Sequence, residues 1–143
     1  MNNSLPGYPI KIRYNDLDTY GHVNNAVYIT YLEEGRTAWF QDKVGANWEW
    51  DKQGILLARH EINYKFPVLF NDQIRIVLWI SDIGMKSFEV SYKIIKKAGE
   101  KWITCTYGKS VAVCFDYANQ RTMEVPQDWK TIFKKSMEIP EIV

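Results

Sequence analysis

Hydrophobic positions follow two different periods along this chain. From Ala26 to about Gln41, apolar residues recur at intervals of three or four, which predicts an amphipathic helix. Later runs alternate between apolar and polar residues, or stop at a proline, as strands do. Strands are therefore predicted over residues 54–68, 73–80, 87–95 and 102–116, with a first strand over 8–14 and a short C-terminal helix over 125–138.

Turn-forming residues separate these elements. Residues 15–24 are rich in Asn, Asp and Gly, and Asn24 or Asn25 is a suitable N-cap for the long helix. The sequence KAGEK, residues 97–101, predicts a hairpin turn. Gly108 interrupts the last long strand, where it predicts a β-bulge.

The order of the elements predicts an α+β fold. Antiparallel strands with one apolar face need a covering layer, and the one long helix can supply it. We expect an antiparallel sheet of about five strands wrapped around that helix. Gly35 in mid-helix costs about 1 kcal/mol relative to Ala, which close contact between helix and sheet would offset. No repeat or linker interrupts the chain, so residues 1–143 are predicted to form a single domain.

The charge balance argues against a nucleic acid or a membrane as partner. The chain has 18 basic and 17 acidic residues, and a formal net charge of +1 provides no electrostatic attraction to either. No apolar run approaches the ~18 residues of a membrane span, and no signal peptide is recognisable. We therefore expect a cytoplasmic protein in which Cys105 and Cys114 are free thiols within strands.

The stretch RYNDLDTYGHVNNAVYITYLEEGR, residues 13–36, carries the candidate chemistry. A helix N-terminus leaves backbone N–H groups unpaired and carries partial positive charge, so it can polarise a carbonyl oxygen. Asp18 lies upstream across a turn that contains Gly21, and this turn can fold the carboxylate back towards Asn24 and Asn25. A carboxylate beside an oxyanion site is the minimum equipment for acyl transfer to water.

Missing motifs narrow the class of substrate. The chain has no G-x-S-x-G elbow, no glycine-rich phosphate loop and no metal-ligand spacing around its two histidines, His22 and His60, so no metal is expected. One carboxylate with a backbone oxyanion site suits a thioester better than an amide. A thiol has a pKa of about 8.5, so it leaves without a strong general acid.

Taken singly, each of these residues also fits a purely structural role. Asp16 and Asp18 can be turn or cap formers, and His22 in a tight turn can simply satisfy its own hydrogen bonds. Lys86 beside a hairpin is typical of a surface charge. The combination of residues, rather than any one of them, therefore carries the functional interpretation.

That combination resembles the hotdog-fold acyl-CoA thioesterases, in the branch of the 4-hydroxybenzoyl-CoA thioesterases. The family pattern looks like an aromatic residue, D-x-D-x-x-G-H/x-V, a polar pair that opens a helix, Y-x-x-Y/F and E-x-x-R. The matching residues are Tyr14, Asp16, Asp18, Gly21, His22, Val23, Asn24, Asn25, Tyr28, Tyr31, Glu33 and Arg36. The later segments INYKFPVLFNDQIRI, GMKSFEVSYKI and RTMEVPQDW are also similar, so the resemblance covers nearly the whole chain.

The resemblance implies a role for several of these residues. Asp18 would attack the thioester carbonyl or activate a water molecule, and the backbone N–H of Asn25 would polarise the carbonyl oxygen. The turn and the acyl pocket would be shaped by Gly21, His22, Val23, Asn24 and Tyr28. Coenzyme A would meet Lys86 and Ser87, with Arg59 and Lys65 as further candidates.

The resemblance also implies an assembly, and it leaves two alternatives open. An acyl-CoA thioesterase of lipid metabolism would need no cofactor, because coenzyme A is part of its substrate, and would form a homodimer or homotetramer by joining sheets edge to edge. One alternative is a thioesterase acting on acyl carrier protein, since Lys96, Lys97 and Lys101 gather positive charge near one hairpin. The other is an acyl-CoA-binding module without catalysis.

Overall fold

The computed structural model describes residues 5–45 and 48–142. Its elements in chain order are β1 (Tyr8–Ile10), a 3-10 turn (Tyr14–Asp16), α1 (Val27–Lys43), β2 (Gln53–Tyr64), β3 (Ile74–Ile83), β4 (Ser87–Ala98), β5 (Lys101–Asp116), β6 (Arg121–Thr122) and α2 (Gln127–Lys135). The predicted α+β class is confirmed. The two-residue strand β6 was not predicted, because two residues are too few to show a period.

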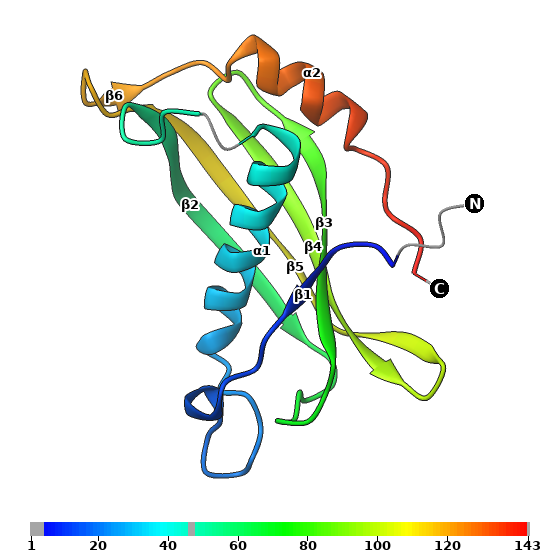
Figure 1. Ribbon diagram of the computed structural model, residues 1–143. Helices are drawn as coiled ribbons and strands as arrows, with labels where there is room; N and C mark the ends of the chain where they lie inside the picture. Colours follow the sequence, from blue (N-terminus) through cyan, green and yellow to red (C-terminus); the bar gives the residue numbers. More distant parts are fainter. Residues whose placement is uncertain (1–4, 46–47, 143) are drawn as a thin grey trace.

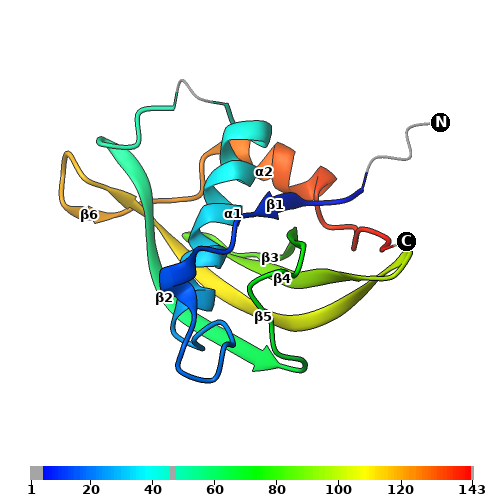
Figure 2. The same ribbon diagram turned by 60° about the horizontal axis from the view of Figure 1, so that its bottom comes forward.

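One antiparallel sheet wraps around α1. Within the described residues its strands follow the order β1-β3-β4-β5-β2. The short strand β6 pairs with the C-terminal end of β5. Figure 2 shows how the sheet curls so that its concave face surrounds the long helix. Apolar residues on alternate positions of β3 and β4 point into that face, as the predicted period of two requires. The twelve-residue strand β2 forms one edge of the sheet.

Close contact between α1 and the sheet explains the glycine in mid-helix. Gly35 is buried, and a Cβ atom added there would collide with the side chain of Ile76 on β3. Glycine therefore lets the helix approach the sheet more closely than any other residue could. The predicted compensation for its helix-breaking cost is confirmed.

The second helix closes the molecule at the C-terminal end of α1 (Figure 1). Trp129 and Phe133 of α2 are fully buried and pack against Phe40 of α1 and Phe88 of β4. The Phe88 and Phe133 rings lie 4.6 Å apart between centroids. This end of the helix is therefore a dense aromatic core.

Several predicted boundaries were wrong, among them the ends of β3 and of α2, which spans only Gln127–Lys135 instead of 125–138. The first strand ends at Ile10 rather than at residue 14, because residues 14–16 turn as a 3-10 helix. The strand predicted over 54–68 stops at Tyr64, three residues before Pro67, where the chain turns towards α1. The N-cap of α1 is Ala26, since Asn24 and Asn25 lie in the turn before the helix.

The bulge predicted at Gly108 was also wrong. Gly108 pairs regularly with Ile62 on one side and with Tyr92 on the other. A Cβ atom there would collide with the backbone carbonyl of Glu61, so glycine is needed for space. The irregularity in β5 falls instead at Cys105, which has no partner on β4.

Both cysteines are buried free thiols in β5, as predicted. Burial raises the pKa of Cys105 and of Cys114 to about 11. Both thiols are therefore protonated at neutral pH, which makes them unreactive.

Candidate active site

A tight loop holds Asp18 in front of the long helix. Leu17 and Val23 pair as an isolated antiparallel bridge, and the Asp18 amide donates to the carbonyl of His22 at 2.8 Å. Gly21 takes a φ of +80°, which favours glycine at this position of the turn. The Asp18 Oδ1 atom accepts the amides of Tyr20 at 2.8 Å and His22 at 3.2 Å. These bonds fix the orientation of a partly buried carboxylate.

Asp16, only two residues away, is held quite differently. Its Oδ2 atom accepts the Tyr31 hydroxyl at 2.7 Å and the Arg13 amide at 2.9 Å. Burial, together with the Asp16 carboxylate, raises the pKa of Tyr31. Asp16 thus ties the 3-10 turn to the middle of α1, which is a structural role, as the sequence suggested for it.

In the turn that precedes α1, the Asn25 amide has no acceptor among the described residues. The Asn24 amide donates to Asp16, and the amides of Ala26 and Val27 both donate to Asn24, at 3.0 and 2.9 Å. Among the residues that the structure describes, the Asn25 amide alone in this series has no acceptor. It lies at the positive end of the helix dipole. A ligand oxygen could therefore take this N–H without breaking an existing bond.

Asp18 and Asn25 line the same cavity. Its volume is about 220 Å³, and its walls are Asp18, His22, Val23, Asn25, Tyr28, Tyr64, Lys65, Phe66 and Pro67. Tyr28 is buried, and burial raises its pKa to about 12, so its hydroxyl stays protonated at neutral pH. Six of the predicted site residues are thus brought together, namely Asp18, His22, Val23, Asn25, Tyr28 and Lys65.

Tyr64 is the most informative wall residue that sequence reasoning missed. Its hydroxyl donates to the Asn25 carbonyl oxygen at 2.9 Å, and its ring packs edge-on against Tyr28 with centroids 5.1 Å apart. It therefore holds the peptide unit that follows the free amide. The only signal in the sequence was its place at the end of a strand, directly before Lys65 and Phe66.

The segment after β2 forms the other wall. The Val23 amide donates to the Val68 carbonyl at 2.8 Å, and His22 pairs with Leu69 as an isolated bridge. The loop that carries Asp18 is thus joined to residues 65–69 through backbone contacts. Phe66 and Pro67 reach the cavity from this segment.

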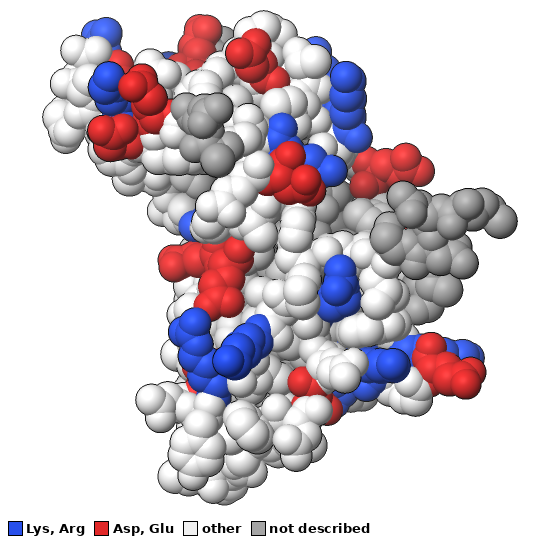
Figure 3. Space-filling view, viewed as in Figure 1, with Lys and Arg blue, Asp and Glu red and all other residues white. Residues whose placement is uncertain are grey.

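The two segments that carry the cavity walls also expose large apolar side chains. Tyr14, Tyr20, Phe66, Leu69 and Phe70 are all exposed, and Tyr20 is 84 % accessible. Figure 3 shows that the lower end of the molecule, where α1 begins, carries few charged groups, whereas both signs are frequent at the upper end. The surface near the site thus favours an apolar ligand or a protein neighbour.

Five predicted residues do not line this cavity. Gly21 and Asn24 shape the loop and the turn, and the exposed Arg59 lies five residues before Tyr64 on β2. Lys86 and Ser87 lie at the opposite end of the sheet. Ser87 pairs with Val113 and Tyr64 with Thr106, so they are seven residues apart along β5, about 23 Å. Within one chain, Lys86 and Ser87 therefore lie far from the cavity that Asp18 lines.

Over residues 5–45 and 48–142, no group of three or more His, Cys, Asp or Glu side chains is placed to hold a metal ion. No helix in those ranges is long and apolar enough to cross a membrane.

Comparison with known proteins gives consistent matches. The family model of the thioesterase-like superfamily matches residues 12–133. YneP of Bacillus subtilis (strain 168), described as a candidate acyl-CoA thioesterase, is 30 % identical over 132 residues, which cover 89 % of this chain and 94 % of YneP. The acyl-acyl carrier protein thioesterase ATL2 of Arabidopsis thaliana is 32 % identical over 87 % of this chain and 65 % of its own length.

A solved structure shares the whole fold. PA2801 of Pseudomonas aeruginosa, described as a candidate thioesterase, superposes with a TM-score of 0.78 and 28 % identity, over 89 % of this chain and 96 % of PA2801. The sheet wrapped around one helix is therefore the architecture of these proteins as well.

Proposed function

This chain belongs to the thioesterase-like superfamily, and on that premise we propose that it is an acyl-CoA thioesterase, which hydrolyses an acyl thioester to a carboxylic acid and coenzyme A. The hotdog fold expected from the sequence agrees with this membership. Such an enzyme would act in lipid metabolism in the cytoplasm.

One observation carries the proposal. Asp18 and Asn25, whose backbone amide has no acceptor within the described chain, line one small cavity at the start of α1. The amide would bind the carbonyl oxygen and stabilise the negative charge that develops on it. The tyrosine hydroxyl at position 64, bonded to the Asn25 carbonyl, would keep this part of the backbone in place.

Two routes lead from this arrangement to products. In the first, an Asp18 oxygen attacks the thioester carbon, the C–S bond breaks, and water hydrolyses the resulting anhydride. In the second, Asp18 removes a proton from water, which attacks the carbon directly while the thiolate departs. Either route needs only one carboxylate, because a thiolate of pKa about 8.5 leaves readily. Both routes remain part of the proposal.

Thiol release across a panel of acyl-CoAs tests the function. The panel runs from acetyl- to palmitoyl-CoA and includes aromatic acyl groups. We expect catalytic turnover with at least one of them. Tight binding of an acyl-CoA without any release of thiol would instead indicate the non-catalytic binding module.

Acyl carrier protein is a second candidate carrier, favoured by the similarity to ATL2. A carrier protein is acidic and would need exposed basic residues. Lys97 and Lys101 are exposed near the β4–β5 hairpin, but Lys96 is mostly buried beside Asp72 and does not belong to such a surface. Relative rates on matched acyl-CoA and acyl-carrier substrates decide between the two carriers.

The proposed function includes assembly of the chain into a homo-oligomer. The edge strand β2 is twelve residues long and would expose its backbone groups in a monomer. We expect a homodimer or homotetramer in which a second copy brings its own Lys86 and Ser87 towards coenzyme A. Light scattering after gel filtration tests this, and a monomer with full activity would contradict it.

A further inference from the structure

The 65–72 segment is joined to the Asp18 loop at Val68 and Leu69. Lys65, Phe66 and Pro67 line the cavity. Directly after them, Val68 accepts the Val23 amide and Leu69 pairs with His22. Because His22 is in turn bonded to Asp18, a displacement of the segment would carry the carboxylate with it.

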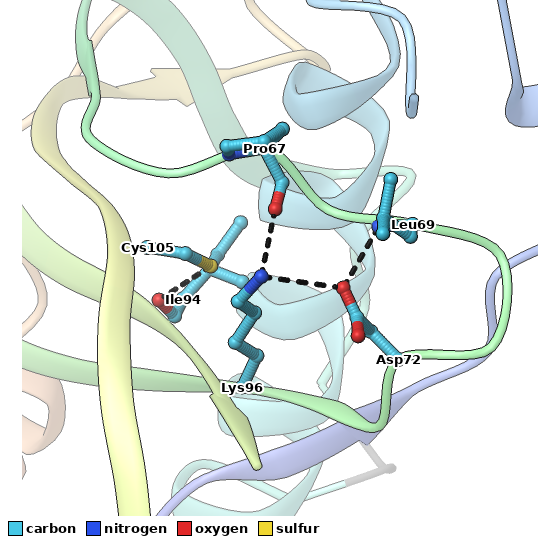
Figure 4. Close-up of polar contacts among 6 residues, drawn as sticks. All are labelled: Pro67, Leu69, Asp72, Ile94, Lys96 and Cys105. Atoms are coloured by element: carbon cyan, nitrogen blue, oxygen red, sulfur yellow. Dashed lines mark hydrogen bonds and ion pairs between the residues drawn. The ribbon is translucent and has the colours of Figure 1, made fainter. Parts of the chain in front are cut away.

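Lys96 holds this segment from the side of the sheet. Its ammonium donates to the Pro67 carbonyl at 2.9 Å and lies 3.5 Å from Asp72 Oδ2 (Figure 4). That same Asp72 oxygen accepts the Leu69 amide at 2.8 Å. The side chains of Lys96 and Asp72 are only 17 % and 22 % exposed, so the pair is screened less than a surface ion pair.

The other contacts of the segment do not replace this one. The amides of Lys65 and Phe66 both donate to the Cys105 carbonyl, which fixes the start of the segment. Pro67 has no N–H and cannot be held by a backbone donation of its own. Its carbonyl, at the point where the segment faces the cavity, depends on the Lys96 ammonium.

We propose that Lys96 is a positioning residue for the reaction, which holds the 65–72 segment, and through it the Asp18 loop, in the place that catalysis requires. The inference rests on the proposed function. Lys96 itself is not among the residues that line the cavity, so it acts through Pro67 and Asp72 and does not touch the substrate. Removing its charge would leave the Pro67 carbonyl without the Lys96 donor, and the Asp72 carboxylate with the Leu69 amide but no counter-charge, in a mostly buried place.

Three variants test this role. Lys96→Met keeps the length of the side chain and removes the ammonium, whereas Lys96→Arg keeps the charge and its donors. We expect kcat for Lys96→Met to fall about tenfold to hundredfold, since a displacement of about 1 Å is enough for such a loss. KM should change less, and Lys96→Arg should restore most of kcat. Lys134→Met, at an exposed position of α2 away from the cavity, is the control and should behave as wild type.

Hydrogen exchange gives a second readout that does not depend on activity. The Val23 amide, which is bonded to Val68, should exchange faster in Lys96→Met and at the wild-type rate in Lys134→Met. A folded Lys96→Met protein with wild-type kcat overturns the proposal, even if its melting temperature is lower, because that result describes a purely structural residue. If the wild type releases thiol from no acyl-CoA, the proposed function fails. Exchange at Val23 then decides about Lys96: faster exchange supports its hold on the loop, and unchanged exchange overturns it.

Discussion

The two ends of α1 lie in opposite environments, one in a buried aromatic core and the other beside a partly exposed polar site. At its C-terminal end, Phe40 packs against Trp129 and Phe133 in a core from which water is excluded. At its N-terminal end, the Asn25 amide has no acceptor within the described chain, and Asp18 is only partly buried. One end gains stability by burying its aromatic side chains, while the other keeps a donor and a charge available. A single helix can therefore serve as both scaffold and reactive site.

The substitution Asp18→Asn tests this difference between the two ends of α1 and should have the largest effect on kcat. Asparagine keeps an oxygen for the amides of Tyr20 and His22, so the loop should stay folded, but the nucleophile or base is lost. We expect kcat to fall about 10³–10⁴-fold, equivalent to about 4–5.5 kcal/mol. Thiol release and thermal melting, measured on the same sample, check this.

Asp16→Asn is the matched control for that experiment. The same chemical change two residues away weakens the bond to the Tyr31 hydroxyl and leaves the cavity wall intact. It should lower stability by about 1–2 kcal/mol with kcat within a few fold of wild type. If the two variants lost kcat equally, the assignment of separate roles to the two carboxylates would be wrong.

The substitution Phe133→Ala examines the opposite end of the helix. The ring is fully buried against Phe88 and Phe40, so its removal should cost about 3–5 kcal/mol of unfolding free energy. Below the new melting temperature, kcat should stay close to wild type. Denaturant unfolding and steady-state kinetics measure the two quantities, and a large loss of kcat in folded protein would show that the ends are coupled.

A smaller effect is expected from Tyr64→Phe. Phenylalanine preserves the packing against Tyr28 and removes only the hydroxyl that holds the Asn25 carbonyl. One neutral hydrogen bond is worth about 0.5–1.5 kcal/mol, so kcat should fall by at most about tenfold. The melting temperature should change by little. An unchanged kcat would show that the Asn25 backbone keeps its position without this bond.

The smallest effect is expected for His60, which lies on β2 between the levels of the two ends of α1. Burial and the charge of Arg36 lower the pKa of His60 below its usual 6.5, although Glu33 opposes this. Below pH 6.5 the unfolded chain therefore binds a proton that the folded protein resists. His60 thus contributes stability above that pH and loses it as the pH falls. A His60→Asn variant should show a flatter decline of melting temperature from pH 7 to pH 5, and an equal slope would refute this contribution.

Most of the fold could be predicted because its long helix and its strands show regular hydrophobic periods in the sequence. The alternation in residues 73–80 and 87–95 predicted two of the long strands, and the helical spacing after Ala26 predicted α1. The errors concern positions whose residue type is determined by packing between strands. Gly108 looked like a bulge, but its neighbours on both strands leave no room for a side chain.

The site was predictable only in its continuous part. Asp18 and Asn25 are seven positions apart, and the turn between them could be inferred from Gly21 and the polar residues around it. Tyr64 and Lys96 come from distant strands and reach the site through the pairing of β2 and β4 with β5. No local pattern encodes such a meeting, since it depends on the register of the whole sheet.

The most direct measurement is a crystal structure with a non-hydrolysable acyl-CoA in which a methylene group replaces the sulfur and the carbonyl is kept. The central prediction is that the carbonyl oxygen accepts the Asn25 amide at about 2.7–3.2 Å, with an Asp18 carboxylate oxygen facing the carbonyl carbon. A carbonyl bound away from the start of α1, with no contact to either residue, would contradict the proposed chemistry at this end of the helix.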